Sequence, residues 1–381
     1  MGKIIYLDNA ATTPVSERVA YTMFPYFTEE YGNPSTSYSL GRKARETVEN
    51  CRANIAKLLN CETEGILFTS GGSESDNMLV KGLARANKGN HIITSSIEHP
   101  AVLKTCEQLE KEGYDITYLP VNTNGRVDIE VLKKSIRPDT CLITIMYANN
   151  ETGVLEPLEE IIRIAHQHNI LVHSDMVQAI GHIPIDIKHL GVDSFSCSGH
   201  KFGAPKGIGI AYIKPGVKGE PLIVGGGQEK EMRAGTENVP SIVGMDKALT
   251  LVCNRMIRNI KKQEELRARF IEKMENVKHR INGSHLNRLA GTINIAFEGI
   301  DGENLKLYLD TKGICVSNGS ACHSGNTEPS HVLKAMQVPK KYINGAIRIS
   351  FGNNSIEEVD YLAKCIKEYL KEVRINGKDT E

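Results

Sequence analysis

The sequence contains several short segments in which a reactive side chain is surrounded by small residues. Lys201 follows Ser198, Gly199 and His200, and more glycines come soon after it. A lysine enclosed by small residues can act as an amine nucleophile and form a Schiff base. A lysine in a glycine-rich loop can also be an ordinary solvated residue, and this segment alone does not distinguish the two.

Cys322 lies in a run of small polar residues, 317–326, and His323 follows it. An exposed cysteine on a flexible polar loop beside a histidine is a candidate reactive thiol, and the alternative is an incidental surface cysteine. The chain has nine cysteines at wide spacings and no Cys-x-x-Cys pair, which argues against a zinc ribbon or a thioredoxin-type redox pair.

Three other side chains stand in or directly after predicted strands. Asp175 ends a strand, where a carboxylate is costly unless it meets a positive partner or caps a helix. Arg348 interrupts an apolar strand pattern and needs an anion, from either the protein or a substrate. His99 follows a third strand, where it could also cap a helix or sit in the core.

A phosphate-binding turn is predicted at residues 69–77, between a strand and a helix. Gly71 and Gly72 allow a tight turn, Ser73 adds a hydroxyl, and the helix N-terminus adds the positive end of its dipole. The segment lacks the lysine of a P-loop and the Gly-x-Gly-x-x-Gly of a dinucleotide site, so a simple helix N-cap remains an alternative.

An alternation of strands and helices must position these segments. The alternation predicts a mostly parallel sheet with helices on both faces, in which ligands bind beyond the carboxyl ends of the strands. The predicted strands are 66–69, 91–95, 115–119, 141–147, 170–174, 193–197 and 208–213, and the predicted helices are 76–86, 101–112, 129–136 and 158–168.

After Pro240 the pattern changes. Apolar residues from Ile257 to Ile281 recur at helical spacing and predict one amphipathic helix that links two domains. Strands at 292–297, 314–317 and 346–350, with helices near 302–310 and 356–373, then indicate a smaller α/β domain.

Length and composition bound the function. The 381 residues are enough for two or three domains. Lys plus Arg and Asp plus Glu both number 46, so the formal net charge is zero and no global field favours nucleic acid or anionic lipid. The N-terminus lacks a signal peptide pattern, and no apolar run is long enough for a membrane helix, so we expect a cytoplasmic protein with no membrane or direct nucleic-acid contact.

Taken together, the motifs strongly resemble cysteine desulfurases of the NifS/IscS type. These belong to the class V aminotransferase branch of the fold-type I pyridoxal-phosphate (PLP) enzymes, and the resemblance covers nearly the whole chain. The matching segments are 6–14, 32–35, 71–77, 98–100, 149–153, 175–178, 198–201, 225–228, 233–238, 319–322 and 347–348.

The resemblance implies the fold and its division. We expect a large PLP-binding domain, 13–256, built on a mostly parallel seven-stranded sheet. Residues 1–12 and 257–381 would form a smaller α/β domain that carries the catalytic cysteine loop.

The resemblance also implies roles for individual residues. Lys201 would hold PLP covalently, Asp175 would pair with the pyridine nitrogen, and His99 would stack on the ring and transfer protons. Arg348 would bind the substrate carboxylate, with Asn33 near the same site. The remaining cofactor contacts would come from Gly72, Ser73, Asn150, Gln178, Ser198, His200 and, from the second subunit of a homodimer, Thr236.

The implied reaction converts L-cysteine to L-alanine and leaves a persulfide on Cys322 for a sulfur-acceptor protein. An iron–sulfur scaffold, a tRNA-thiolation protein and a thiamine pathway are all open as acceptors. The alternatives are a selenocysteine lyase, another class V aminotransferase, or a sulfur-relay protein without cofactor chemistry. No metal is implied.

Three residues depart from the common family pattern. Met176 stands where a small residue usually follows the cofactor aspartate, and His182 replaces a common lysine. His323 follows the nucleophile where relatives often carry Ser or Thr, and we expect it to assist ionisation of Cys322.

Overall fold

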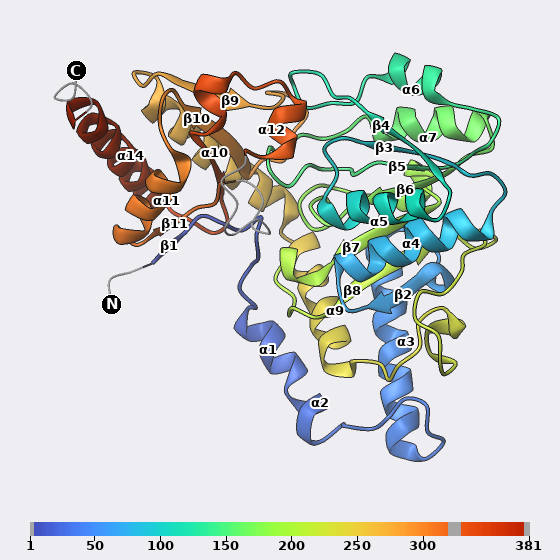
Figure 1. The fold of residues 1–381 in the computed structure, drawn as a ribbon. Helices are drawn as coiled ribbons and strands as arrows, with labels where there is room; N and C mark the ends of the chain where they lie inside the picture. Colours follow the sequence, from blue (N-terminus) through green and yellow to red (C-terminus); the bar gives the residue numbers. More distant parts are fainter. Residues whose placement is uncertain (1–3, 319–328, 377–381) are drawn as a thin grey trace.

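The computed structural model describes residues 4–318 and 329–376, and a seven-stranded sheet lies at its centre (Figure 1). The strand order is β2-β8-β7-β6-β5-β3-β4, with β8 antiparallel to both neighbours and the other pairs parallel. The predicted mostly parallel sheet is therefore confirmed. Its strands are β2 (Ile66–Thr69), β3 (His91–Ser95), β4 (Asp115–Leu119), β5 (Thr140–Thr144), β6 (Leu171–Asp175), β7 (Ser194–Ser198) and β8 (Gly209–Ile213).

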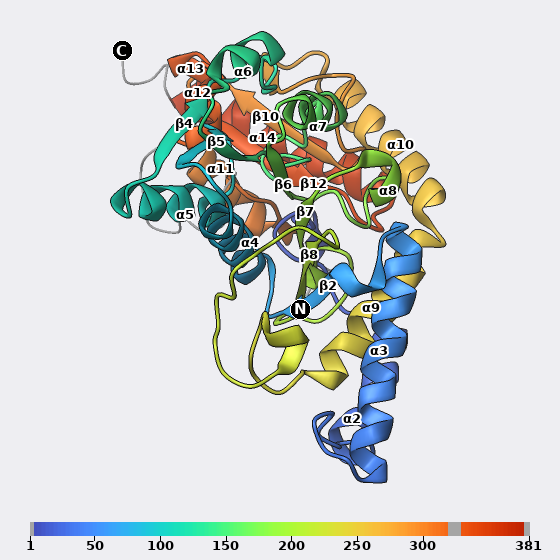
Figure 2. The same ribbon diagram turned by 90° about the vertical axis from the view of Figure 1, so that its right-hand side faces the viewer.

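Helices cover both faces of this sheet, which explains why its central strands are buried along their whole length (Figure 2). Helices α4 and α5 lie on one face, and α7, α8 and α9 lie on the other. Their bounds are α4 (Gly72–Ala86), α5 (Pro100–Lys111), α7 (Leu158–Gln167), α8 (Ile187–Leu190) and α9 (Val239–Cys253), with α6 (Ile129–Ser135) preceding β5.

The N-terminal helices α1 (Glu17–Met23) and α2 (Pro25–Thr28) extend away from the sheet, toward the bottom of Figure 1. The long helix α3 (Ser39–Leu59) returns from them and packs against α9. Three short 3₁₀ turns complete this part of the chain: η1 (Thr63–Gly65), η2 (Gly199–Lys201) and η3 (Gln228–Glu231).

A smaller unit lies at the left of Figure 1 and has its own apolar core. An antiparallel sheet of order β12-β10-β9 packs against α10 and α14, and β1 pairs in parallel with β11. The elements are β1 (Ile5–Tyr6), α10 (Met256–Met274), β9 (His279–Asn282), β10 (Thr292–Phe297), α11 (Gly302–Thr311), β11 (Ile314–Cys315), α12 (His331–Ala335), α13 (Lys340–Ile343), β12 (Ala346–Ser350) and α14 (Ile356–Asn376).

The single helix predicted from Ile257 to Ile281 is wrong at its C-terminal end. Helix α10 ends at Met274, and Ile281 lies on β9, opposite Ile295 of β10. Ile281 still packs against the same apolar core as Phe270 of the helix. Because a strand residue and a helix residue fill one core, the apolar spacing continued across the boundary although the backbone changed.

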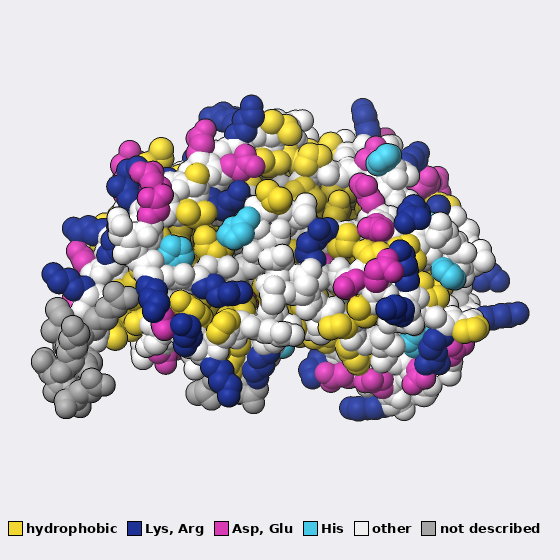
Figure 3. Space-filling model, turned by 90° about the horizontal axis from the view of Figure 1, so that it is seen from above, with side chains coloured by type: hydrophobic (Ala, Val, Ile, Leu, Met, Phe, Trp, Pro, Cys, Tyr) yellow, Lys and Arg dark blue, Asp and Glu magenta, His cyan; other side chains and the backbone are white. Residues whose placement is uncertain are grey.

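The surface carries charges of both signs. On the face seen in Figure 3, Lys and Arg side chains are interspersed with Asp and Glu, in line with the formal net charge of zero. Among the helices of the described ranges, none combines the length and apolar character needed to cross a bilayer.

Candidate active site

The polar segments meet at one edge of the central sheet. Strand β6 ends at Asp175, and the adjacent parallel strand β7 ends at Ser198, directly before the turn that carries Lys201. His99 begins α5 just beyond the end of β3. Since parallel strands place their carboxyl ends on the same edge, side chains more than 100 residues apart in sequence converge here.

The Lys201 amine contacts the N-terminal segment of the chain. Its Nζ donates to the carbonyl oxygens of Ala10 and Ala11, both at 2.9 Å. Gln178 Nε2 donates to the same Ala10 oxygen at 3.0 Å. The segment before α1 therefore joins the Lys201 amine to the loop that follows β6.

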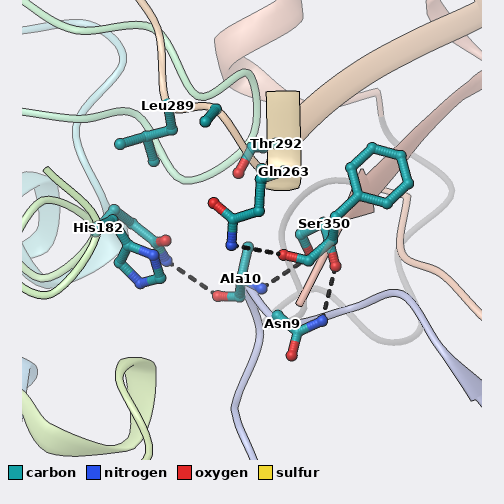
Figure 4. Close-up of a pocket in the computed structure, with 11 residues that line it drawn as sticks. Asn9, Ala10, His182, Gln263, Leu289, Thr292 and Ser350 are labelled. Atoms are coloured by element: carbon teal, nitrogen blue, oxygen red, sulfur yellow. Dashed lines mark hydrogen bonds between the residues drawn. The ribbon is translucent and has the colours of Figure 1, made fainter. Parts of the chain in front are cut away.

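Figure 4 shows how Ala10 is held in this position. Its backbone N–H donates to Ser350 Oγ at 2.8 Å, and Asn9 Nδ2 donates to the Ser350 carbonyl at 2.8 Å. A small cavity of about 20 Å³, roughly the size of one water molecule, lies behind Ala10 and is lined in part by His182 and Gln263. The cavity is too small for a substrate, so it is not the substrate-binding site. It lies beside the segment that contacts Lys201.

Asp175 and His99 lie together beside this lysine. The Asp175 carboxyl is buried, and the hydrogen bond it receives within the described chain is from the Val177 N–H, 2.9 Å from Oδ1. Burial raises its pKa, and His99, the Val177 amide and Lys201 act in the opposite direction. The arrangement favours a cationic partner for Asp175.

His99 has its tautomer set by helix α5. Its Nδ1 accepts the Ala101 N–H at 3.1 Å as the N-cap of the helix, so the proton of the neutral ring is on Nε2. Burial lowers the pKa of His99, which favours this neutral form. The ring therefore presents an N–H donor on its other side.

The predicted anion cradle is formed by the first turn of α4. The first N–H groups of a helix have no intrahelical acceptor and can bind a phosphate. Gly71 has φ 152°, and a Cβ at Gly72 would lie 2.9 Å from the Val177 side chain and 3.5 Å from Ser198. Gly72 therefore allows the turn to approach the loop after β6, and Gly71 is favoured by its positive φ.

Two neutral histidines, His200 and His182, lie beside Lys201. His200 Nδ1 lies 3.1 Å from Thr12 Oγ1, and burial lowers its pKa to about 4. His182, one of the departures from the family pattern, bonds through Nε2 to the Lys201 carbonyl oxygen at 3.1 Å, and burial lowers its pKa as well. Both rings are neutral hydrogen-bonding groups near pH 7.

Arg348 is almost fully buried and meets a protein carboxylate. Its Nη2 lies 2.6 Å from Asp8 Oδ1, and its Nη1 donates to the Asn150 carbonyl at 2.9 Å. Its Nε has no hydrogen-bond partner among the described residues. Of the two anions considered from sequence, the structure supplies the protein one, and binding of a substrate carboxylate stays a prediction.

Two predicted residues, Thr236 and Asn33, make no hydrogen bond to this cluster within the described residues. Thr236 is exposed in the loop before α9, and Asn33 is exposed in the loop between α2 and α3, at the far end of Figure 1. Cys322 lies outside the described residues, as does His323. The described chain on either side of them reaches the site: Ser317 pairs with the Arg348 backbone, and His331 Nε2 bonds to the Glu98 carbonyl at 3.0 Å.

Sequence reasoning missed a second group of buried polar side chains behind Asp175. Asp76 and Glu98 are buried carboxyls, and Ser196 and His173 are buried on the neighbouring strands. These residues could have been noticed in the sequence, because several are polar residues within strands that a parallel sheet buries on both faces. A helix N-cap turn concealed Asp76, because acidic residues are common in a first turn.

The fold and the site define the class of protein. Residues 5–362 match the family described as aminotransferase class-V, and the chain belongs to this family, whose members use PLP as a general property. The resemblance found in the sequence is thereby confirmed.

The most informative relatives narrow the class. The chain is 49% identical over 376 residues to a protein named cysteine desulfurase IscS from Methanosarcina thermophila, covering 98% of this chain and 93% of that protein. A solved NifS-like protein has a TM-score of 0.92 and 40% identity, covering 97% of this chain and all of that one. A structure described as SspA in complex with cysteine has a TM-score of 0.82 and 36% identity, covering 91% of this chain and 98% of that one.

Proposed function

We propose that this chain is a PLP-dependent cysteine desulfurase that converts L-cysteine to L-alanine and leaves a persulfide on Cys322. The observation that carries the proposal is the convergence of Lys201, buried Asp175 and His99 at the carboxyl edge of the sheet. The relatives named cysteine desulfurase and the cysteine complex of SspA support this substrate.

The residues present fit PLP. Within the described residues, the buried Asp175 carboxyl accepts one hydrogen bond, from the Val177 N–H, which leaves it an acceptor for a protonated pyridine nitrogen. The glycine turn before Ser73 and the N-terminus of α4 would bind the phosphate, with Ser198 beside the turn and His200 as a further contact. Asn150 and Gln178 would bind the phenolic oxygen side of the ring. When bound through Lys201, PLP supplies an electron sink.

The chain's own groups would handle substrate and protons. The Lys201 amine would accept the proton from the substrate Cα, and the His99 Nε2–H would act as the second proton-transfer group. Arg348 would hold the substrate carboxylate by exchanging part of its contact to Asp8, and Asn33, which is exposed, would come near a substrate through the homodimer.

Sulfur transfer would use Cys322. Its thiolate would attack the substrate sulfur, forming an S–S bond while the Cβ–S bond breaks and the electron pair stays on carbon, which is then protonated to alanine. The described ends of the segment support this role because Ser317 bonds to the backbone of Arg348 and His331 bonds to the carbonyl of Glu98, next to His99. His323 would assist thiolate formation.

A homodimer is part of the proposal. Thr236 would reach the phosphate of the partner's site, and both Thr236 and Asn33 are exposed in the single chain, away from its own lysine. Large aromatic side chains are also exposed on the N-terminal helices and the following loop, which favours a covered surface there. They are Tyr21, Phe24, Phe27, Tyr31 and Tyr38.

The domain division stays a proposal: 13–256 as the large domain, and 1–12 with 257–381 as the small one. One apolar core combines Ile5 and Leu7 with residues from α10 to α14, which supports the placement of the N-terminal segment. The larger core also includes Val332 and Met336 of the α12 region, so the two domains would share a packed boundary.

The sulfur acceptor would be a protein of iron–sulfur cluster assembly or of tRNA thiolation, reached in the cytoplasm. The rival functions are a selenocysteine lyase and another class V aminotransferase. The relatives that are named cysteine desulfurase favour desulfuration.

The test uses the purified chain and two variants. The wild type should carry a visible cofactor absorption that is absent in Lys201→Ala, and mass spectrometry after borohydride treatment should place an adduct on Lys201. Cys322→Ser should keep the absorption and lose alanine release from cysteine. An adduct elsewhere, or normal turnover in Cys322→Ser, would contradict the assignment, and faster turnover of selenocysteine would favour the lyase.

A further inference from the structure

A second carboxyl, Asp76, lies behind Asp175 and is almost fully buried. Carboxylate oxygens of Asp76 and Asp175 and a ring nitrogen of His99 all lie within 4.8 Å of one another. Asp76 comes from the first turns of α4, whereas Asp175 ends β6. Two carboxyls from different elements therefore share one enclosed space at the site.

The groups that face Asp76 offer it little positive charge. Ser196 Oγ on β7 donates a hydrogen bond to Asp76 Oδ1, and His173 Nε2 on β6 lies 3.8 Å from the same oxygen. Glu98, after β3, is a third buried carboxyl that acts on Asp76. Within residues 4–318 and 329–376, no Lys or Arg forms an ion pair with Asp76.

His173 is an uncharged ring in this space. Its Nδ1 lies 2.8 Å from Thr144 Oγ1, and burial lowers its pKa to about 3. Its Nε2 is buried and has no hydrogen-bond partner among the described residues. At 3.8 Å the uncharged His173 ring gives Asp76 neither a positive charge nor a hydrogen bond, which favours the neutral form of the buried Asp76 carboxyl.

Electrostatics favour the same assignment. Two carboxylates this close in a low-dielectric space do not both ionise, and the better-stabilised one keeps the charge. Asp175 receives the Val177 N–H and faces His99 and Lys201, whereas Asp76 has a serine hydroxyl and a neutral histidine. Burial and the neighbouring Asp175 raise the pKa of Asp76 well above its usual range.

We propose that Asp76 is a positioning residue that holds a proton, so that Asp175 is the charged member of the pair and faces the cofactor ring. This inference deepens the proposed function, because the charge on Asp175 matters for a bound pyridinium. Asp76 itself stays one layer behind the reacting groups. Its neutral carboxyl would stabilise the charge on Asp175 by keeping a second negative charge out of the space the two carboxyls share.

Infrared spectroscopy of the purified protein in D₂O tests the protonation state directly. At about pH 8, free carboxyls are ionised, so a carbonyl-stretch band of a protonated acid marks a buried one. The wild type minus Asp76→Asn difference spectrum should contain such a band, in both cofactor-free and PLP-loaded protein. Glu98→Gln is the matched control and should remove a band at a different frequency. A difference spectrum with only carboxylate bands would overturn the proposal.

A pH titration of the PLP absorption provides a second readout. Asn mimics a protonated Asp, so Asp76→Asn should change the proton affinity of the bound chromophore by less than about twofold, whereas loss of a real negative charge should change it tenfold or more. A tenfold change would contradict the proposal. Failure of the chain to bind PLP would sink the proposed function but leave the infrared result on Asp76 intact.

Discussion

Two groups of buried carboxyls lie on the central sheet, and they are satisfied in opposite ways. Glu229 of η3 receives a two-point ion pair from Arg52 of α3, with N–O distances of 2.7 and 2.8 Å, and the Phe68 N–H at 2.7 Å. Asp76 and Asp175 share a space with a neutral histidine and have few donors. Among the described residues, both carboxylate oxygens of Glu229 accept hydrogen bonds, whereas Asp175 accepts one, which suits the cofactor partner proposed for it.

The completed pair holds a strained turn. Glu229, Lys230 and Glu231 all have positive φ, between 46° and 65°, which is costly for residues with side chains. This turn precedes the loop with Thr236, the residue proposed to serve the partner subunit. The difference teaches that an arginine partner lets Glu229 stay charged and structural, whereas a buried carboxyl without such a partner either holds a proton or needs a further cation.

Arg52→Met should produce the largest effect, because it leaves Glu229 buried without its cation. We expect a loss of about 3–5 kcal/mol in the free energy of unfolding, measured by urea denaturation. The matched control is Arg85→Met, which breaks the half-exposed pair with Glu112 and should cost less than about 1 kcal/mol. Equal losses of unfolding free energy in the two variants would show that burial does not make the Arg52–Glu229 pair more important than the half-exposed pair.

Glu156 is a buried carboxyl away from the site, and like Asp175 it accepts few hydrogen bonds from the described residues. Its Oε2 accepts the Val127 N–H at 2.8 Å, its Oε1 has no partner among the described residues, and burial raises its pKa to about 7. An unfolded glutamate titrates near about 4.3, so the folded chain binds more protons between these values.

Stability should therefore fall as the pH rises from about 4.3 to 7 and show no further change from this group above that range. The expected fall due to Glu156 is about 3 kcal/mol, and Glu156→Gln should remove it from the pH profile of the unfolding free energy. Parallel profiles for the variant and the wild type would show that this carboxyl does not titrate in the folded state as inferred.

Ser196→Ala should produce the smallest loss of unfolding free energy, and the size of that loss reports whether Asp76 is charged. Losing a hydrogen bond to a neutral carboxyl should cost about 1 kcal/mol of unfolding free energy, whereas a bond to a charged one would cost about 2–3 kcal/mol. Ser194→Ala on the same strand is the control, because its hydroxyl makes only a 3.5 Å contact to the Val172 carbonyl. Calorimetry at one pH distinguishes the two values.

Much of the fold could be predicted from sequence because its central strands are strongly apolar and separated by helical spacing. Strands β2, β3 and β4 match the predicted ranges at both ends. The end of α10 could not be predicted, since Ile281 fills the same core from a strand. Helix α3 was not predicted, although its buried residues Ala44, Val48, Cys51, Ile55 and Leu59 recur at helical spacing.

The convergence of Lys201, Asp175 and His99 could be predicted because each lies in a segment whose residue types suggest a chemical role. The residues that support the site could not be predicted, because they depend on tertiary contact. The Ala10 carbonyl that accepts the Lys201 amine has no side-chain signature at all. Asp76 and His173 became visible only when α4 and β6 were placed side by side.

The N-terminal segment, residues 5–13, contacts both the smaller unit and the central-sheet unit. Residues 5–13 pair with β11, bond Arg348 through Asp8, hold the Lys201 amine at Ala10, and meet His200 through Thr12 and Thr13. Trimming by an aminopeptidase, or a protease site cut too close when an affinity tag is removed, would loosen all four attachments at once. Fusions and immobilisation chemistry therefore belong beyond α14, at the other terminus.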